Sequence, residues 1–255
     1  YCDRFGIIPA MSIINLSLTT IKQELPDFVY QKLASYSAQS NSYFHQPDEL
    51  RALIAKKHSI AIDKISLCAG IDQAILLLST LYGQHGHIFT PTYICYTDIK
   101  RVGGDLTEHY SFDGGTYNVS SSTIDGATII FIANPNNPAG ITSRDTILEL
   151  VKNNPTAKVV VDEAYGDFAG ESVAQDVADH DNLVVLRSFS KGYALAGFRL
   201  GYVVAQPKLL EDMVLESTWF NVAYTSVGAG VAALEHEDYF ADIRATILAE
   251  REKFE

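Results

Sequence analysis

Short apolar runs rich in Val, Ile and Leu alternate along the chain with stretches in which apolar residues recur every three or four positions. The first pattern is typical of buried strands and the second of amphipathic helices. Strands are predicted over residues 65–68, 87–90, 105–110, 128–132, 158–161, 183–187 and 202–205. Helices are predicted over residues 48–58, 71–82, 143–153, 207–220 and 239–254. This alternation predicts an α/β fold, with a mostly parallel sheet of about seven strands in a three-layer α/β/α arrangement.

The composition is that of a globular protein with a large core. Apolar residues make up 47% of the 255 positions and charged residues 20%, which excludes a disordered chain. The net charge of −12 argues against nucleic acid as a partner, because binding phosphates requires clustered Lys and Arg. No apolar stretch reaches the about 18 residues of a membrane span, and residues 1–20 lack the layout of a signal peptide. We therefore expect a soluble cytoplasmic protein without a membrane partner.

The three cysteines, Cys2, Cys68 and Cys95, are odd in number and lack the spacing of metal ligands. A disulfide framework needs paired cysteines and an oxidising compartment. We therefore expect free thiols in a reducing compartment, and no metal site.

The segment 188–201, SFSKGYALAGFRLG, concentrates the candidate chemistry. It places Lys191 near Ser188 and Ser190 on a tight loop after one predicted strand, and Arg199 just before the next. A Schiff base with a phosphorylated cofactor needs an amine, together with hydroxyls and a guanidinium for the phosphate. A surface lysine and arginine around a polar turn explain this segment, taken alone, equally well.

Two upstream segments favour the cofactor interpretation. Residues 158–165, KVVVDEAY, form a β-branched run that ends in Asp162, and residues 133–140, ANPNNPAG, form a turn after a predicted strand. In this order the three segments resemble the fold-type I pyridoxal-phosphate-dependent aminotransferases, most closely the histidinol-phosphate aminotransferase branch. The resemblance runs from about residue 43 to the last residue. It implies pyridoxal 5′-phosphate as cofactor, and transfer of an amino group between an amino acid, or an amino-acid-derived phosphate, and a 2-oxo acid.

The resemblance implies roles for four residues at the reacting centre. Lys191 would form the Schiff base and, once released, move a proton between the substrate Cα and the cofactor C4′. Asp162 would pair with the pyridine nitrogen and keep it protonated; a helix N-cap is its alternative role. Tyr165 and Asn137 would donate hydrogen bonds to the cofactor O3′. A half-buried aromatic without such a role is the alternative for Tyr165.

Phosphate binding is expected to be shared among hydroxyls, a guanidinium and a helix N-terminus, which favours a dianion. The expected contributors are Ser188, Ser190, Arg199 and the strand-to-helix turn of Gly70, Ile71 and Asp72. Ile71 replaces the small residue of the family pattern, and a contact through its backbone N–H tolerates that change. A plain strand-to-helix turn is the alternative for this segment.

Two tyrosine positions have roles that the resemblance implies around the cofactor. Tyr93 occupies the position at which the family stacks an aromatic ring on the cofactor, with Tyr96 as the alternative if the register differs by a turn. Tyr43 resembles the tyrosine that crosses the dimer interface to the neighbouring phosphate, and a packed surface aromatic is its alternative role. A homodimer is expected on this ground.

The chain departs from the family pattern towards both ends. We expect residues 1–40 to form an N-terminal arm and part of a small domain, and residues 41–235 the cofactor-binding large domain. Residues 236–255 are expected to begin the helix that leads to a C-terminal small domain, absent from this chain through truncation. In the N-terminal segment Asn15 keeps an amide, but apolar Leu16 and Leu18 make a wall that binds an imidazole or an amine less well. A related amino acid or amino-acid phosphate is therefore as good a substrate candidate as histidinol phosphate.

Two other functions stay open besides the leading prediction of an aminotransferase. A decarboxylase or lyase uses the same scaffold and cofactor, and differs in which substrate bond stands perpendicular to the ring. A non-catalytic homologue would serve as an interaction subunit. Such a protein has no chemical reason to retain Lys191, Asp162 and Arg199 together.

Overall fold

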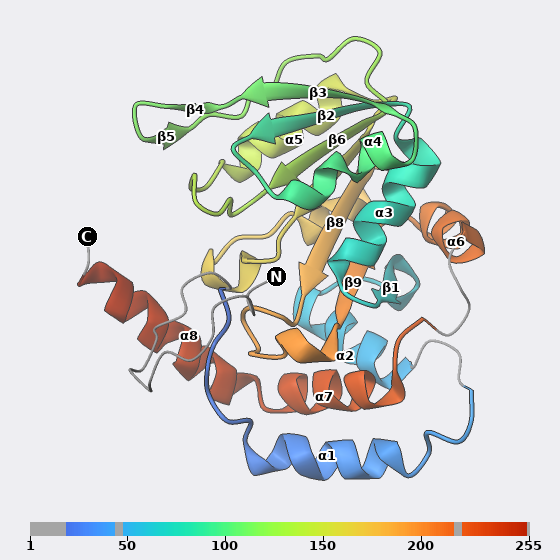
Figure 1. The fold of residues 1–255 in the computed structure, drawn as a ribbon, viewed down its shortest axis with the longest axis vertical. Coiled ribbons are helices and arrows are strands. Elements are labelled where there is room, and N and C mark those ends of the chain that lie inside the picture. Colours follow the sequence, from blue (N-terminus) through green and yellow to red (C-terminus); the bar gives the residue numbers. More distant parts are fainter. Residues whose placement is uncertain (1–18, 44–47, 217–220, 254–255) are drawn as a thin grey trace, which may run out of the picture.

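The computed structural model describes residues 19–43, 48–216 and 221–253, and these ranges build a seven-stranded central sheet (Figure 1). The strands are β1 (Ile65–Cys68), β2 (His85–Thr90), β3 (Asp105–Tyr110), β6 (Ile129–Ala133), β7 (Lys158–Asp162), β8 (Leu183–Ser188) and β9 (Gly201–Val204), with β4 (Phe112–Asp113) and β5 (Thr116–Tyr117) forming a separate two-stranded sheet. The helices are α1 (Asp27–Ser37), α2 (Asp48–His58), α3 (Ile71–Tyr82), α4 (Asp98–Arg101), α5 (Arg144–Asn153), α6 (Pro207–Glu216), α7 (Tyr224–Glu235) and α8 (Glu237–Glu252).

The strand order is β1-β9-β8-β7-β6-β2-β3. The pairs from β8 through β7, β6 and β2 to β3 are parallel, and β9 runs antiparallel to both β8 and β1. Helices cover both faces of this sheet (Figure 1). The predicted fold class, a mostly parallel sheet in three layers, is confirmed.

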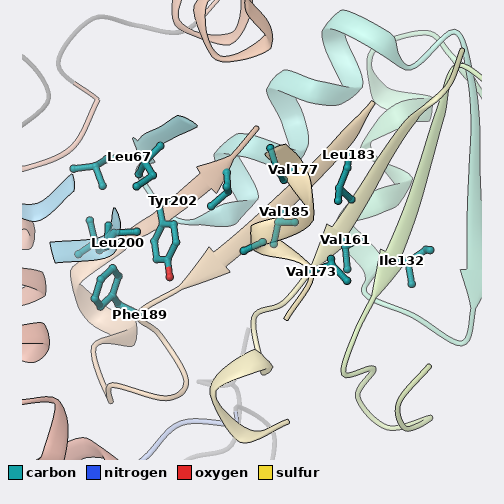
Figure 2. Close-up of a cluster of buried hydrophobic side chains, with 14 of the residues drawn as sticks. Leu67, Ile132, Val161, Val173, Val177, Leu183, Val185, Phe189, Leu200 and Tyr202 are labelled. Carbon is teal, nitrogen blue, oxygen red and sulfur yellow. The ribbon is translucent and has the colours of Figure 1, made fainter. Parts of the chain in front are cut away.

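Consecutive residues of the central strands point to opposite faces of the sheet, as strand geometry requires. On β7, Val159 and Val161 enter the core cluster drawn in Figure 2, whereas Val160 enters the cluster on the other face. Residues of α1, α2, α5, α7 and α8 join the first cluster, and residues of α3, α4 and α6 join the second. Because both faces of the central strands are buried, these strands are continuous apolar runs in the sequence.

Three of the described helices, α1, α4 and α7, escaped prediction, and the reason is clearest for α7. Its residues are buried almost all round, so it lacks the polar face that produces an amphipathic period. The helix is also rich in small residues: a Cβ at Gly228 would lie 2.8 Å from the ring of Tyr36 on α1. Close packing of α1 and α7 therefore depends on a residue type that disfavours helices when the sequence is considered alone.

The chain geometry gathers several loops at one edge of the sheet. The parallel strands β2, β6, β7 and β8 all end there. The register pairs Gly201, the first residue of β9, with Ser188 at the end of β8 and with Cys68 at the end of β1. Open α/β sheets bind ligands at such an edge. Segments from six places in the sequence are thus available to one site.

Cys68 is buried and Cys95 is half-buried, and both are free thiols; Cys2 lies outside the described residues. Burial raises the pKa of the Cys68 thiol, which keeps it protonated and unreactive. Across the described ranges, no helix has both the length and the apolar character needed to cross a membrane.

Candidate active site

A cavity of about 510 Å³ opens at this edge of the sheet. Its lining combines polar side chains from strand ends with a few apolar ones: Thr19, Thr20, Ile71, Asp72, Thr92, Tyr93, Ile94, Tyr96, Ala133, Pro135, Asn137, Asp162, Ala164, Tyr165, Ser188, Ser190, Lys191, Ala196 and Arg199. All the predicted site residues except Gly70 and Tyr43 belong to this lining. The structure thus brings together residues that lie more than a hundred positions apart.

Lys191 follows β8 on a loop that its own backbone holds in place. The Ser190 N–H donates to Ser188 Oγ at 3.0 Å, and the Leu195 N–H donates to the Phe189 carbonyl at 3.1 Å. The Lys191 Nζ lies in the cavity, where it donates to the carbonyl of Thr19 at 2.8 Å and lies 3.1 Å from Thr19 Oγ1. The amine is therefore aimed into the cavity.

Asp162 ends β7 and is buried, with 4% of its surface exposed. Its Oδ2 accepts from the Tyr96 hydroxyl at 2.7 Å, and its Oδ1 accepts from the Ala164 N–H at 2.9 Å. Burial raises the pKa of this carboxyl to about 6, against the effect of both hydrogen bonds. A carboxylate so close to its pKa at the floor of a cavity is suited to pair with a cationic ring nitrogen.

Tyr165 lies three residues beyond Asp162 and is joined to Asn137 and Thr19. The Asn137 Nδ2 donates to the Tyr165 hydroxyl at 3.1 Å, and the same hydroxyl is 2.6 Å from Thr19 Oγ1. Lys191 Nζ is 5.5 Å from the centroid of the Tyr165 ring. These four side chains form one polar group at the cavity wall.

Arg199 meets the strand-to-helix turn at the start of α3. Its guanidinium donates to Asp72 Oδ2 at 2.7 Å, and the Tyr93 hydroxyl donates to Asp72 Oδ1 at 2.9 Å. Gly70 has φ +79°, and a Cβ there would lie 2.7 Å from the Arg199 guanidinium. Glycine therefore serves both the turn and the close approach of the arginine. Arg199 itself adopts a left-handed conformation with φ 49°, a strained state for a non-glycine residue and one that recurs at functional sites.

Tyr43 lies apart from the Lys191 cavity in the single chain. It lines a second hollow of about 270 Å³ with residues 40, 42 and 222–225, and 86% of its surface is exposed. Asn15, Leu16 and Leu18 lie outside the described residues. Thr19 and Thr20, next to them in sequence, do line the cavity. Sequence reasoning overlooked these two threonines, because it weighed only Asn15, Leu16 and Leu18 in that segment.

A buried ion cluster of Lys57, Glu163, Asp167 and Arg187 lies behind the same strand ends, and the sequence did not reveal it. Arg187 donates to Glu163 Oε2 at 2.9 Å and to Asp167 Oδ1 at 2.6 Å, and Lys57 Nζ is 3.2 Å from the same Asp167 oxygen. Burial alone would raise the pKa of Asp167, but the charges of Arg187 and Lys57 outweigh it and hold the pKa below its usual value. Adjacency to Asp162 in the DEAY segment is the one signal that could have pointed to Glu163.

Three comparisons with known proteins bear on this site. The sequence matches the family model "Aminotransferase class I and II" over residues 12–255. It is 31% identical to the histidinol-phosphate aminotransferase of Gloeobacter violaceus, over 94% of this chain and 71% of that protein.

Among solved structures, the L-threonine-O-3-phosphate decarboxylase of Porphyromonas gingivalis has a TM-score of 0.79 at 25% identity, over 90% of this chain and 71% of that one. The histidinol-phosphate aminotransferase of Clostridium acetobutylicum has a TM-score of 0.81 at 21% identity, over 90% of this chain and 72% of that one. At the lower identity the likeness concerns the fold alone.

Proposed function

Because the chain belongs to the class I and II aminotransferases, in the histidinol-phosphate aminotransferase branch, we propose that its cavity uses pyridoxal 5′-phosphate to transfer an amino group between an amino acid and a 2-oxo acid. One observation carries the proposal. The cavity gathers a lysine amine, a buried carboxylate and a guanidinium from separate segments: Lys191, Asp162 and Arg199. These are the three groups that this cofactor's aldehyde, ring nitrogen and phosphate require.

The residues present fit the cofactor. Lys191 would hold it covalently, and Asp162 would face its ring nitrogen. Arg199, Ser188 and Ser190, with the N-terminus of α3, would hold its phosphate. Because Gly70 has no Cβ, the Arg199 guanidinium can lie close to the N-terminus of α3, where the phosphate would bind.

When bound, pyridoxal phosphate supplies an aldehyde that takes up the amino group and a ring that withdraws electrons from the substrate α-carbon. The other tasks fall to the chain's own residues. Lys191 Nζ would carry a proton to and from that carbon. Tyr165 and Asn137 would donate hydrogen bonds at the phenolic side of the ring. Thr19 holds the Lys191 amine within the cavity through the two contacts already described.

Substrate range follows from the cavity lining. Thr19, Thr20, Tyr93 and Ile94 lie at the cavity with the proposed cofactor residues. This mixed wall suits an amino acid or an amino-acid-derived phosphate. The alternative is a decarboxylase, as the Porphyromonas structure is named. Amino transfer is favoured because the family model and the curated relative both describe aminotransferases.

We propose a cytoplasmic homodimer in which Tyr43 reaches the neighbouring subunit's phosphate site. The exposure of Tyr43 and its place in a hollow other than the Lys191 cavity support this role. Sedimentation that finds only monomers would contradict it.

The test is an absorption spectrum of the purified full chain incubated with pyridoxal phosphate, followed by borohydride reduction and peptide mass mapping. We expect a visible band that disappears on reduction, with the adduct on Lys191. An adduct on Lys100 or Lys158 would overturn the site assignment. Analysis of the products from an amino acid and a 2-oxo acid then separates the two reactions: a new amino acid supports transfer, and released carbon dioxide supports decarboxylation.

A further inference from the structure

Tyr96 lines the cavity although its side chain is fully buried, and so far it has been described only as a donor to Asp162. It lies on a short 3-10 helix, η2 (Ile94–Thr97), that follows β2. Its ring stacks on that of Phe131 from β6, with centroids 5.0 Å apart and an interplanar angle of 6°. The Tyr93 ring meets it edge-on at 5.8 Å. These contacts fix the direction of the phenol across the end of β6 towards β7.

At the end of that direction the Tyr96 hydroxyl donates to Asp162 Oδ2 at 2.7 Å. The other carboxylate oxygen accepts from the Ala164 backbone, 2.9 Å away. In the described part of the chain, Tyr96 thus supplies the side-chain hydrogen bond recorded for this carboxylate. A buried anion with so few donors depends strongly on each of them.

The charges around Asp162 make this donor more important. Asp72 on α3 and Glu163, the next residue, are acidic neighbours that disfavour its ionisation. Lys191 and Arg199 line the same cavity, but the recorded bonds of these two cations are to Thr19, Ala196 and Asp72. Burial, the largest influence, also favours the protonated carboxyl.

We propose that Tyr96 is a positioning residue that keeps Asp162 ionised and directed at the cavity, and that its hydroxyl is thereby required for efficient amino transfer. The second half of this statement rests on the proposed function. The first half concerns the chain alone. Neither needs the Tyr96 ring to touch the cofactor, so the alternative of Tyr96 as the stacking residue is replaced by a role through Asp162.

The chemistry of the phenol supports the direction of the bond. Burial and the nearby Asp162 charge raise the pKa of Tyr96 well above its ordinary value. The hydroxyl therefore stays protonated at any working pH and acts as the donor. Loss of one hydrogen bond to a charged group should move the Asp162 pKa upward by about one unit or more, so that about half of the carboxyl population or more is protonated at pH 7.

The direct test is Tyr96→Phe in the full chain without cofactor, with the Asp162 carboxyl followed by ¹³C NMR against pH and its signal assigned with Asp162→Asn. The Asp162 pKa should rise by about one unit or more. Tyr36→Phe is the matched control, because Tyr36 is also a buried tyrosine that donates to a carboxylate, Glu49, far from this site. The control should leave the Asp162 pKa unchanged. An unchanged pKa in folded Tyr96→Phe overturns the proposal.

The loaded enzyme gives an independent measurement. Tyr96→Phe should lower kcat about tenfold with little change in KM, and should move the acid limb of the kcat profile to higher pH. In an Asp162→Asn background the same change should have almost no further effect, because Tyr96 acts through that carboxylate. Additive losses would mean a structural role and would overturn the proposal. Borohydride mapping to Lys191 is scored separately, so failure of the proposed function is distinguishable from failure of this inference.

Discussion

The Lys191 cavity and the buried ion cluster lie at the same strand ends. Residues that are adjacent in sequence contribute to different regions of these two. Asp162 faces the cavity, while Glu163 enters the buried ion cluster; Ser188 faces the cavity, while Arg187 enters the cluster. In the cluster, Arg187 and Glu163 side chains are 4% and 3% exposed and directly paired. The cavity, in contrast, keeps Arg199 half-exposed at 51%. Paired buried charges hold the fold, whereas polar groups directed at a cavity are available to a ligand.

The largest expected effect is the difference between replacing Lys191 in the cavity and replacing Lys57 in the ion cluster. Lys191→Ala should lower amino transfer by about three orders of magnitude or more, because it removes both the covalent attachment and the proton carrier. Its thermal midpoint without cofactor should stay close to that of the parent. Lys57→Ala should show the reverse, with a borohydride adduct still on Lys191 and a lower midpoint. An active Lys191→Ala variant would contradict the assignment of a catalytic role to Lys191 and a structural role to Lys57.

Breaking the ion cluster should lower the free energy of unfolding. Arg187→Met leaves Glu163 and Asp167 without their main partner, and we expect the free energy of unfolding to fall by about 3–5 kcal/mol in urea titration. Arg144→Met is the matched control, since its pair with Asp176 is 45% exposed at the arginine. That control should cost under about 1 kcal/mol. Equal losses in both variants would mean that burial does not distinguish the pairs.

The charges of the ion cluster should affect the pH dependence of stability through their effect on the pKa of His58. Burial, followed by the charges of Arg187 and Lys57, lowers the pKa of His58 to about 3, and its Nε2 lies 2.7 Å from the Tyr202 hydroxyl. The unfolded chain binds a proton near pH 6.5, so stability is lost as pH falls from there towards 3. We expect about 2–3 kcal/mol of this loss between pH 7 and pH 4, and a flatter profile in His58→Gln. Identical slopes for the two proteins would contradict the assignment.

Asp162 should affect the pH dependence of stability in the direction opposite to His58, over part of the same pH range. Its pKa is higher in the folded chain, about 6 against 3.8, so the folded state binds the extra proton and falling pH stabilises it in that window. Asp162→Asn should remove this contribution and steepen the acid loss. Unfolding curves between pH 4 and pH 6 measure the difference, and a slope equal to that of the parent would contradict it.

The same contrast explains what the sequence could predict. β1, α2 and α3 were predicted to the residue, because their apolar patterns and end signals agree. The cavity residues were reachable because strand-end segments converge in any parallel sheet. The ion cluster, the bond from Tyr96 to Asp162 and the place of Thr19 depend on contacts between distant segments. Local pattern contains no signal for such contacts, and α7 was missed for the related reason that total burial leaves no period.

The most direct test of the central claim compares neighbours, Asp162→Asn and Glu163→Gln, by urea unfolding without cofactor and by amino transfer with it. Asp162→Asn should keep or slightly raise stability at pH 7.5, since a buried charge is removed, and should lose about two orders of magnitude in rate. Glu163→Gln should lose about 2–4 kcal/mol of stability and retain much of its rate when folded. The opposite assignment, with Asp162→Asn unfolding and Glu163→Gln inactive but stable, would contradict the account.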